Sequence, residues 1–247
     1  MNQLTSVNNP YIKSLAKLHN SKTRKEEKKF LVEGEHLVSE AYKTNHLEAI
    51  IYSDLKYKID GVKNIYVTEN IIKKLSLTKT PQQVMGVCSF ISEKVINPRR
   101  FLLIDNIQDP GNLGTLLRSC LGFNIDFIYL NNETVDIYND KVIRASQGAI
   151  FHLDFTYANL EEVIPMLKSH GVSVYGTDVT SGVDLEDIEV PSKYAIILGN
   201  EGSGVNPKIL NKTNQNIYIK TNPQLESLNV GVAGSIILYH FDKKRIL

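Results

Sequence analysis

Three segments of the sequence combine glycine with amide, carboxyl or guanidinium side chains next to apolar runs. The first, DNIQDPGNLGTLLRS, holds Asn112 and Arg118, and the second, LGNEGSG, places Glu201 among three glycines. Glycines let a backbone approach a small ligand closely and present its N–H groups. The third segment, ESLNVGVAGS, holds Ser227 and Asn229 ahead of a glycine-rich stretch. Such residues suit a site that holds a polar small molecule.

Each segment also has a plainer structural interpretation. Asn112 follows an Asp-Pro-Gly turn and suits the N-cap of a helix that begins there, and Ser227 suits the N-cap of the last helix. Arg118 could be a surface cation or an ion-pair partner. The glycine loop could be a tight turn, since it lacks both the Lys-Ser/Thr of a P-loop and the G-x-G-x-x-G of a dinucleotide site. Glycines inside the last helix predict close packing against another helix or a partner subunit.

The elements that must position these segments alternate between strands and helices. Alternation of this kind predicts an α/β fold with a largely parallel sheet covered on both faces, and ligands of such sheets bind beyond the carboxyl ends of the strands. Strands are expected at 101–107, 126–131, 151–156, 172–179, 194–200 and 216–221, and helices at 112–123 and 159–171.

The first part of the chain predicts a second, smaller α/β domain. A helix is expected over 30–42 and another over 69–77, with strands at 49–53, 64–68 and 82–90. The polar stretch ISEKVINPRR is typical of an interdomain linker. The sequence therefore predicts one domain over 1–95 and another over 96–247.

Charge is unevenly distributed. The whole chain has 28 Lys and Arg against 27 Asp and Glu, for a net charge of +1. Its first thirty residues hold seven basic residues, Arg24 among them, against two acidic ones. A basic arm indicates contact with phosphate backbones, although a solvated helix face with paired Lys and Glu would look the same.

Taken in order, the motifs at 112–118, 198–204 and 227–233 resemble the three signature motifs of the SpoU (TrmH-like) RNA 2′-O-ribose methyltransferases. The resemblance extends over 101–247. It implies a SPOUT fold whose C-terminal segment threads a trefoil knot, a homodimer formed through the catalytic domain, and an N-terminal L30e-like module that holds RNA. It also implies S-adenosyl-L-methionine as the methyl donor.

The resemblance assigns individual roles as well. It implies active-site roles for Arg118, Asn112, Glu201, Ser227 and Asn229, and cofactor contacts at Thr177, Gly199, Ile219 and Leu228. A guanidinium stays protonated and has no acceptor lone pair, so Arg118 suits a grip on phosphate or on a developing alkoxide better than a general base. The third motif departs from the family, because Lys220 and Pro223 stand where a proline and a glycine are usual.

The function implied is methylation of a ribose 2′-hydroxyl, with 23S rRNA expected as the substrate. The alternatives are a tRNA methyltransferase and an RNA-binding relative that no longer transfers methyl. No histidine has metal-ligand spacing, and the two cysteines, Cys88 and Cys120, predict neither a disulfide framework nor a redox pair. The N-terminus lacks the features of a signal peptide and no apolar run is long enough to span a membrane, so a cytoplasmic protein is expected.

Overall fold

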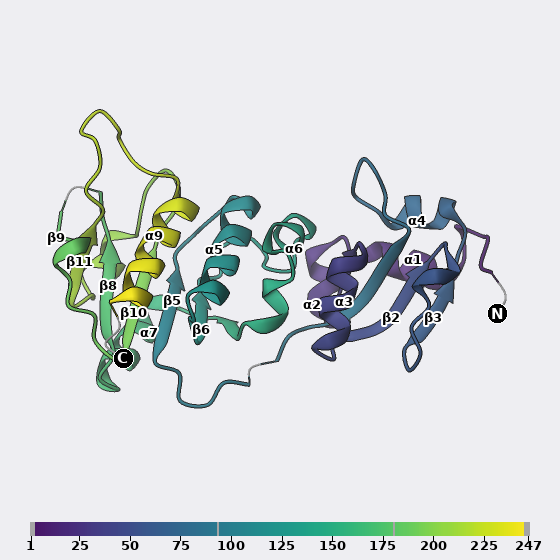
Figure 1. Ribbon diagram of the computed structural model, residues 1–247, viewed down its shortest axis with the longest axis horizontal. Helices are drawn as coiled ribbons and strands as arrows, with labels where there is room; N and C mark the ends of the chain where they lie inside the picture. The colour runs from purple at the N-terminus through teal and green to yellow at the C-terminus, as the bar shows by residue number, and fades with distance from the viewer. Residues whose placement is uncertain (1–2, 93, 180, 245–247) are drawn as a thin grey trace. The chain divides into compact units, whose positions relative to one another are not determined.

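The chain folds into two compact units, and the computed structural model describes residues 3–92, 94–179 and 181–244 (Figure 1). Unit 1 comprises Met1–Ser92 together with Asp136–His152, and unit 2 comprises Glu93–Val135 together with Leu153–Leu247. The chain therefore returns to unit 1 for a short segment after it has begun unit 2.

Unit 1 is built on a four-stranded sheet with the order β1-β4-β2-β3. Strand β4 pairs antiparallel with β1 and β2, whereas β2 and β3 are parallel. In chain order the elements are α1 (Pro10–Lys17), α2 (Ser21–Glu27), β1 (Lys29–Glu33), α3 (Glu35–Lys43), β2 (Leu47–Tyr52), η1 (Leu55–Tyr57), β3 (Lys63–Tyr66), α4 (Glu69–Leu75), β4 (Val84–Ser89), α6 (Asp140–Ser146) and η2 (Ala149–His152). Apolar residues of α1 and α4, such as Ile12 and Ile71, pack on one face of the sheet.

The helix expected over 30–42 is wrong in its first part. Lys29–Glu33 form strand β1, in which Phe30 and Val32 are buried and their neighbours are half-buried. Gly34 then adopts a φ of +99°, a conformation that side chains rarely tolerate, and α3 begins only at Glu35. The alternation in FLVEG is typical of a strand, and Gly34 separates it from the helical pattern that follows.

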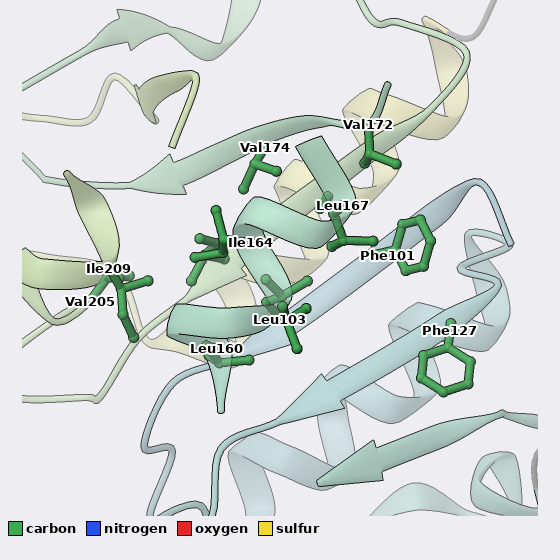
Figure 2. Packing of buried hydrophobic residues seen from close by; sticks show 13 residues of the cluster. Phe101, Leu103, Phe127, Leu160, Ile164, Leu167, Val172, Val174, Val205 and Ile209 are labelled. Atoms are coloured by element: carbon green, nitrogen blue, oxygen red, sulfur yellow. The ribbon is translucent and has the colours of Figure 1, made fainter. Parts of the chain in front are cut away.

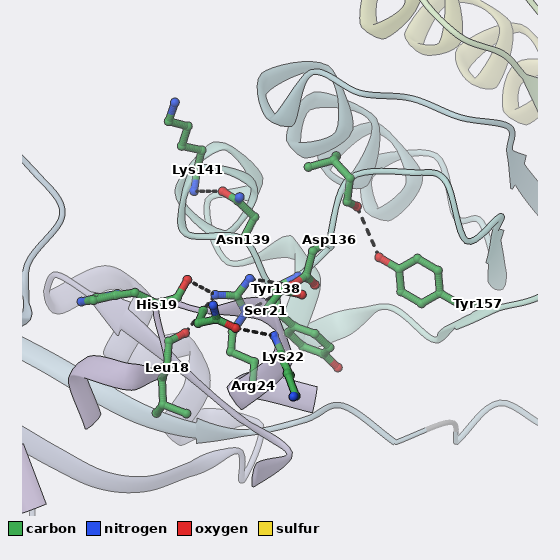
Figure 3. Close-up of polar contacts among 12 residues, drawn as sticks. Leu18, His19, Ser21, Lys22, Arg24, Asp136, Tyr138, Asn139, Lys141 and Tyr157 are labelled. Carbon is green, nitrogen blue, oxygen red and sulfur yellow. Dashed lines mark hydrogen bonds and ion pairs between the residues drawn. The ribbon is translucent and has the colours of Figure 1, made fainter. Parts of the chain in front are cut away.

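The basic arm contains one residue that is not available to a partner. Arg24 is 6% exposed, and its guanidinium donates to both the carboxylate of Asp136 and the carbonyl oxygens of Leu18 and His19 (Figure 3). This buried ion pair joins α2 to the segment that precedes α6. Inclusion of Arg24 among the phosphate-binding cations is therefore wrong, because its charge is already neutralised inside unit 1.

Unit 2 contains a seven-stranded sheet with the order β7-β6-β5-β10-β8-β11-β9, in which every pairing is parallel. In chain order its elements are β5 (Arg100–Ile104), α5 (Pro110–Gly122), β6 (Phe127–Leu130), β7 (Phe155–Tyr157), α7 (Leu160–Ser169), β8 (Ser173–Thr177), β9 (Val183–Asp184), η3 (Leu185–Asp187), β10 (Tyr194–Leu198), α8 (Pro207–Leu210), β11 (Gln215–Tyr218) and α9 (Val230–Lys243). The prediction of a parallel α/β sheet is confirmed.

Helices cover both faces of this sheet. On one face, Ile164 and Leu167 of α7 pack against Leu103 of β5 and Val174 of β8 (Figure 2). On the other face lie α5 and α9, which pack against each other. Gly234 of α9 lies against Leu198 of β10. Side chains alternate along each strand, so apolar residues are required at successive positions. This explains why the strands read as continuous apolar runs.

The start of one predicted strand was wrong, and helices α6 and α8 were not predicted. The strand expected over 151–156 begins only at Phe155, because Ala149–His152 form a 3-10 helix of unit 1. The short helix α8 (Pro207–Leu210) was not expected, although Asn206-Pro207 is a good start signal with Asn206 as its N-cap.

Candidate active site

The first two candidate segments follow neighbouring strands. Strands β6 and β7 lie on one side of β5 and strands β10 and β8 on the other, so the order of the sheet reverses between β5 and β10. Crevices at such reversals are the usual ligand sites of open parallel sheets. The loops that follow β5 and β10 lead to Asn112 and Glu201 respectively.

Helix α5 begins two residues earlier than the sequence predicted. Pro110 is its first residue, and the carboxylate of Asp109 caps it by accepting the N–H of Asn112 at 2.8 Å. The prediction that Asn112 is the N-cap is therefore wrong. Asp109 is the stronger start signal, because it is followed by Pro110 at the first helical position. The correction matters for function, since it leaves the side chain of Asn112 free to bond elsewhere.

A chain of hydrogen bonds joins the three segments. The amide nitrogen of Asn112 donates to Oε1 of Glu201 at 3.1 Å, and the amide nitrogen of Asn229 donates to Oδ1 of Asn112 at 2.8 Å. Residues more than a hundred positions apart in the sequence thus meet around one amide. The structure brings Asn112, Glu201 and Asn229 together at the carboxyl end of the sheet.

Glu201 is held as a carboxylate. Burial by itself would raise the pKa of Glu201, but hydrogen bonds from the N–H of Asp109, the amide of Asn112 and the N–H of Gln108 outweigh burial and lower it. The two backbone donors lie at 3.0 and 3.2 Å from its oxygens. Glu201 therefore remains ionised at neutral pH and ties its own loop to the start of α5.

The glycine loop is a closed turn that requires its first glycine. Asn200 and Gly204 exchange two backbone hydrogen bonds of 2.9 Å, and a Cβ on Gly199 would lie 2.2 Å from backbone atoms of Gly204 and Val205. The N–H groups of Gly202 and Ser203 both donate to Oδ1 of Asn200. Both interpretations of this loop were open, and the structure favours the tight turn, because those N–H groups already have an acceptor.

Two supporting residues were missed by the sequence analysis. Besides organising the turn, Asn200 donates from its amide to the carbonyl oxygen of Asn106, which fastens the two loops together. Asp105, 4% exposed at the end of β5, accepts the N–H of Asn206 at 2.8 Å and the amide of Asn131 at 2.7 Å. Burial raises the pKa of Asp105. Its signal in the sequence is an aspartate directly after the apolar run FLLI.

The last helix starts later than predicted. Asn229 caps α9 by accepting the N–H groups of Gly231 and Val232 at 2.9 and 3.2 Å, so Ser227 as N-cap is wrong. Ser227 is exposed, and its hydroxyl makes no hydrogen bond to any described residue. A Cβ on Gly234 would lie 2.4 Å from Leu116 of α5. Of the two explanations offered for glycine in this helix, the structure supports close packing against another helix.

The residues expected to contact a cofactor lie at the ends of adjacent strands. Thr177 ends β8, Gly199 follows β10 and Ile219 follows β11, and these three strands are neighbours. The hydroxyl of Thr177 donates to the carbonyl oxygen of Ile197 at 2.8 Å. Leu228 is half-buried and directly precedes the cap of α9.

Arg118 is exposed, and so are Lys220 and Pro223, the two residues of the third segment that depart from the family motif. Arg118 lies on α5, and its guanidinium makes no ion pair or hydrogen bond with the residues that the structure describes. Lys220 and Pro223 lie in the loop between β11 and α9, where the N–H of Leu225 donates to the carbonyl oxygen of Asn222. Pro223 thereby occupies the second position of a turn, which suits its fixed φ.

The described residues contain no candidate metal site, no helix that could span a membrane and no disulfide. No three His, Cys, Asp or Glu among them could hold a metal ion, and none of their helices is long and apolar enough to cross a membrane. Both cysteines are free and buried, as expected for Cys120, and burial raises their pKa values.

Comparison with known proteins covers both units. Residues 99–239 match the SpoU rRNA Methylase family, and residues 9–86 match the MRM3-like substrate binding domain. The chain is 39% identical over 245 residues to the 23S rRNA (guanosine(2553)-2′-O)-methyltransferase RlmP of Bacillus subtilis, an alignment that covers 97% of this chain and 99% of RlmP.

Solved structures resemble the whole chain. An AdoMet-bound rRNA methyltransferase from Sinorhizobium meliloti has a TM-score of 0.89 at 26% identity and covers 100% of this chain and 99% of its own. An RNA 2′-O ribose methyltransferase has a TM-score of 0.83 at 26% identity, with full coverage of both chains.

Proposed function

The chain belongs to the SpoU family of RNA methyltransferases, and from this premise we propose that it transfers a methyl group from S-adenosyl-L-methionine to a ribose 2′-hydroxyl of 23S rRNA. The observation that carries this proposal is the similarity to RlmP, which spans nearly the full length of both chains. An enzyme of this activity works on ribosomal RNA, so we also propose that the protein acts in the cytoplasm.

The donor set at the carboxyl end of the sheet fits S-adenosyl-L-methionine. Adenine and ribose are commonly held by backbone groups, and the N–H groups of Gly199, Ile219 and Leu228 have no hydrogen-bond partner among the described residues. Gly199 also removes the Cβ that would block the turn. We propose that these three backbone positions hold the cofactor, with Thr177 beside them.

In this reaction the protein has to position the reactants more than it has to activate the methyl donor. When bound, S-adenosyl-L-methionine would supply a sulfonium methyl that is already electrophilic; the ribose oxygen would gain this methyl, S-adenosyl-L-homocysteine would leave, and the hydroxyl proton would pass to solvent water. We propose that the linked side chains of Asn112, Glu201 and Asn229 orient the substrate, and that the free hydroxyl of Ser227 adds a further hydrogen bond.

Arg118 suits a role on the RNA side of the reaction. Its exposed guanidinium has no counter-ion among the described residues, so it is available to a phosphate or to the oxygen that develops negative charge. A guanidinium donates hydrogen bonds and cannot accept a proton under ordinary conditions. We propose that Arg118 stabilises the developing alkoxide rather than removing the proton.

We propose a division of labour along the chain, with residues 1–95 as the RNA substrate-binding domain and 96–247 as the catalytic SPOUT domain, except that Asp136–His152 pack with unit 1 and are assigned to it. The match of residues 9–86 to a substrate binding domain supports the first assignment. In the catalytic domain, we propose that the segment after β10 threads the trefoil knot that the resemblance implies.

We also propose that the protein acts as a homodimer through α5 and α9. An exposed apolar stripe on these helices supports the proposal. Val232, Ile236 and Tyr239 follow one face of α9 with exposures of 47%, 39% and 51%, and Leu121 of α5 is 41% exposed. A second copy of the chain would remove these side chains from water.

Mapping ribose methylations in ribosomal RNA tests the proposed function. Cells that lack the gene are expected to lose one 2′-O-methyl group in 23S rRNA, and the purified protein with S-adenosyl-L-methionine is expected to restore it. Restoration on tRNA alone would move the substrate to tRNA. If calorimetric titration shows no saturable binding of the cofactor, the protein is instead an RNA-binding relative that no longer transfers methyl. Lys220 and Pro223, which depart from the family motif, are the reason for this alternative.

A further inference from the structure

Unit 1 contains a cavity whose lining includes none of the residues assigned to methyl transfer. It is a shallow, partly open cavity, and most of the about 460 Å³ of empty space within it is open to solvent at its mouth. Its apolar wall comes from β1, α4, β4 and the loop after α4, with Leu31, Leu75, Leu77 and Met85 among the lining residues. A flat apolar ligand is the kind of group that such a wall would remove from water.

The cavity also offers hydrogen-bonding groups of both kinds. Asp140 and Arg144, one turn apart on α6, line it and form a 3.0 Å ion pair, with 34% and 36% of their side chains exposed. A carboxylate beside a guanidinium presents acceptors next to donors. The hydrogen-bonding edge of a nucleobase has the complementary pattern, with donors next to acceptors.

One of the lining residues is a half-buried histidine. His19 lines the cavity, and its Nε2 is buried without a hydrogen bond to the described residues. Burial lowers the pKa of His19, against an opposing effect of the nearby Asp140 carboxylate. The lowered pKa favours the neutral imidazole at physiological pH, so His19 adds a polar but uncharged group to the wall of the cavity.

The mouth of the cavity is held in place. Glu33, which also lines the cavity, accepts hydrogen bonds from the hydroxyls of Ser76 and Thr78 and from the N–H of Gln82. These contacts fix both ends of the loop that carries Leu77, whose side chain is 51% exposed. The apolar side chain at the mouth is thus presented to solvent by a fastened loop.

The surroundings favour a negatively charged polymer. Unit 1 carries sixteen Lys and Arg against eleven Asp and Glu. Lys74 and Lys141 directly adjoin the lining residues Leu75 and Asp140 in the sequence, are exposed, and form no ion pair with the described residues. Exposed lysines without counter-ions suit the phosphates on either side of a captured base.

We propose that this cavity takes an unpaired nucleobase of the RNA substrate, with its hydrogen-bonding edge against Asp140 and Arg144 and its face against the apolar wall. Sequence-specific recognition of RNA commonly uses bases splayed out of the helix into pockets of this kind. The proposal rests on the proposed function only in taking RNA as the ligand. It would make unit 1 a reader of sequence as well as a holder of phosphate.

An introduced tryptophan tests the proposal, because the chain contains no tryptophan of its own. Leu77→Trp puts one indole at the mouth of the cavity, and Leu55→Trp puts one on an equally open position of the same unit, 59% exposed and outside the cavity. Each full-length variant is titrated with the four nucleoside 5′-monophosphates and with ribose 5-phosphate. We expect saturable quenching of Leu77→Trp by at least one nucleotide, and none from ribose 5-phosphate.

A second substitution tests the polar edge. In the Leu77→Trp background, Arg144→Ala is expected to raise the half-saturating nucleotide concentration about tenfold, the effect of losing one good hydrogen-bonded contact. Lys58→Ala is the matched control, because the ion pair of Lys58 with Asp60 lies outside the cavity. An unchanged half-saturation in Arg144→Ala would overturn the proposal.

The remaining outcomes separate the two proposals. Absence of saturable quenching at Leu77→Trp, or an equal response to ribose 5-phosphate, would remove the base pocket. Neither result would touch methyl transfer, which is measured separately. Conversely, saturable nucleotide binding in a chain that methylates no RNA would retain the pocket and remove the proposed function.

Discussion

The side chain of Asn112 is both a donor and an acceptor. Its amide nitrogen donates to Glu201, and its amide oxygen accepts from Asn229. An amide side chain can do both, whereas an ionised carboxylate can only accept. Asn112→Asp keeps the shape, loses the donor and places a second carboxylate beside Glu201. We expect unit 2 to lose about 1–2 kcal/mol of unfolding free energy, and methyl transfer to fall at least about tenfold.

A matched substitution controls for the added charge. Asn124 also donates from its amide to a carboxylate, that of Asp242, at 3.0 Å on the surface of the same unit. Asn124→Asp should change urea denaturation much less and leave methyl transfer near its original rate. Equal effects of the two substitutions would mean that the position of Asn112 has no special importance.

Glu201 predicts a pH dependence of stability. Hydrogen bonds lower its folded-state pKa below that of an ordinary glutamate, about 4.3, despite the opposing effect of burial. A depressed pKa contributes stability above the unfolded-state value, and this contribution is lost as the pH falls through the folded-state value. The stability gap between the original protein and Glu201→Gln should therefore narrow from pH 6 to pH 3 in urea titrations; a constant gap would contradict this.

Arg118 separates binding of RNA from chemistry. Arg118→Lys keeps a positive charge but loses the planar fork of donors. RNA affinity is expected to stay within about threefold, whereas the rate constant of methyl transfer falls about a hundredfold, as on loss of a donor to developing negative charge. Single-turnover methylation of 23S rRNA measures the second quantity, and full activity in this variant would remove Arg118 from the reaction.

At the scale of elements, the packing of α9 on α5 depends on missing side chains. Gly234→Ala would place a Cβ 2.4 Å from Leu116 and 2.6 Å from Leu198. Alanine raises helix propensity by about 1 kcal/mol, but overpacking costs about 1–3 kcal/mol, so a net loss of stability is expected. Gly122→Ala in α5 meets no atom within 4 Å and should be neutral or stabilising in the same urea denaturation.

If Gly234→Ala were as stable as Gly122→Ala, the two helices would not be held at the distance that the structure shows. The same packing positions the site, because Asn112 lies in the first turn of α5 and Asn229 caps α9. Any shift of one helix along the other would move these two side chains apart.

At the scale of the whole molecule, the exposed apolar stripe on α9 predicts a dimer. Ile236→Lys should turn a dimer into a monomer in sedimentation experiments, because burying an unpaired ammonium is very unfavourable. Met166 on α7 has the same exposure, 39%, and Met166→Lys is the control. A protein that stays dimeric in Ile236→Lys, or is monomeric to begin with, would reject the proposed interface.

Much of the molecule follows from its sequence. Apolar runs separated by helical patterns predicted the parallel sheet of unit 2, since a strand buried on both faces must be apolar at successive positions. Glycine in the last helix predicted close packing, and Gly234 does lie against the side chains of Leu116 and Leu198. The three motifs were recognised because their residue types and order are specific, even though each has an ordinary structural use.

Local competition explains what the sequence left undecided. Asp109 and Asn112 are both good N-caps, as are Ser227 and Asn229, and the sequence prediction chose the wrong member of each pair. Burial of Arg24 depended on Asp136, more than a hundred residues away. A pairing over such a distance leaves no periodic signal in the chain.

Residue types and their spacing thus determined the sheet, its helices and the chemistry available at the strand ends. Tertiary structure alone decided which side chains meet: that the amide of Asn112 links Glu201 to Asn229, and that α6 returns to unit 1 to close its cavity. The reason is physical. Strands and helices are specified by neighbours along the chain, whereas a hydrogen bond between distant loops exists only after packing has fixed the distance between them.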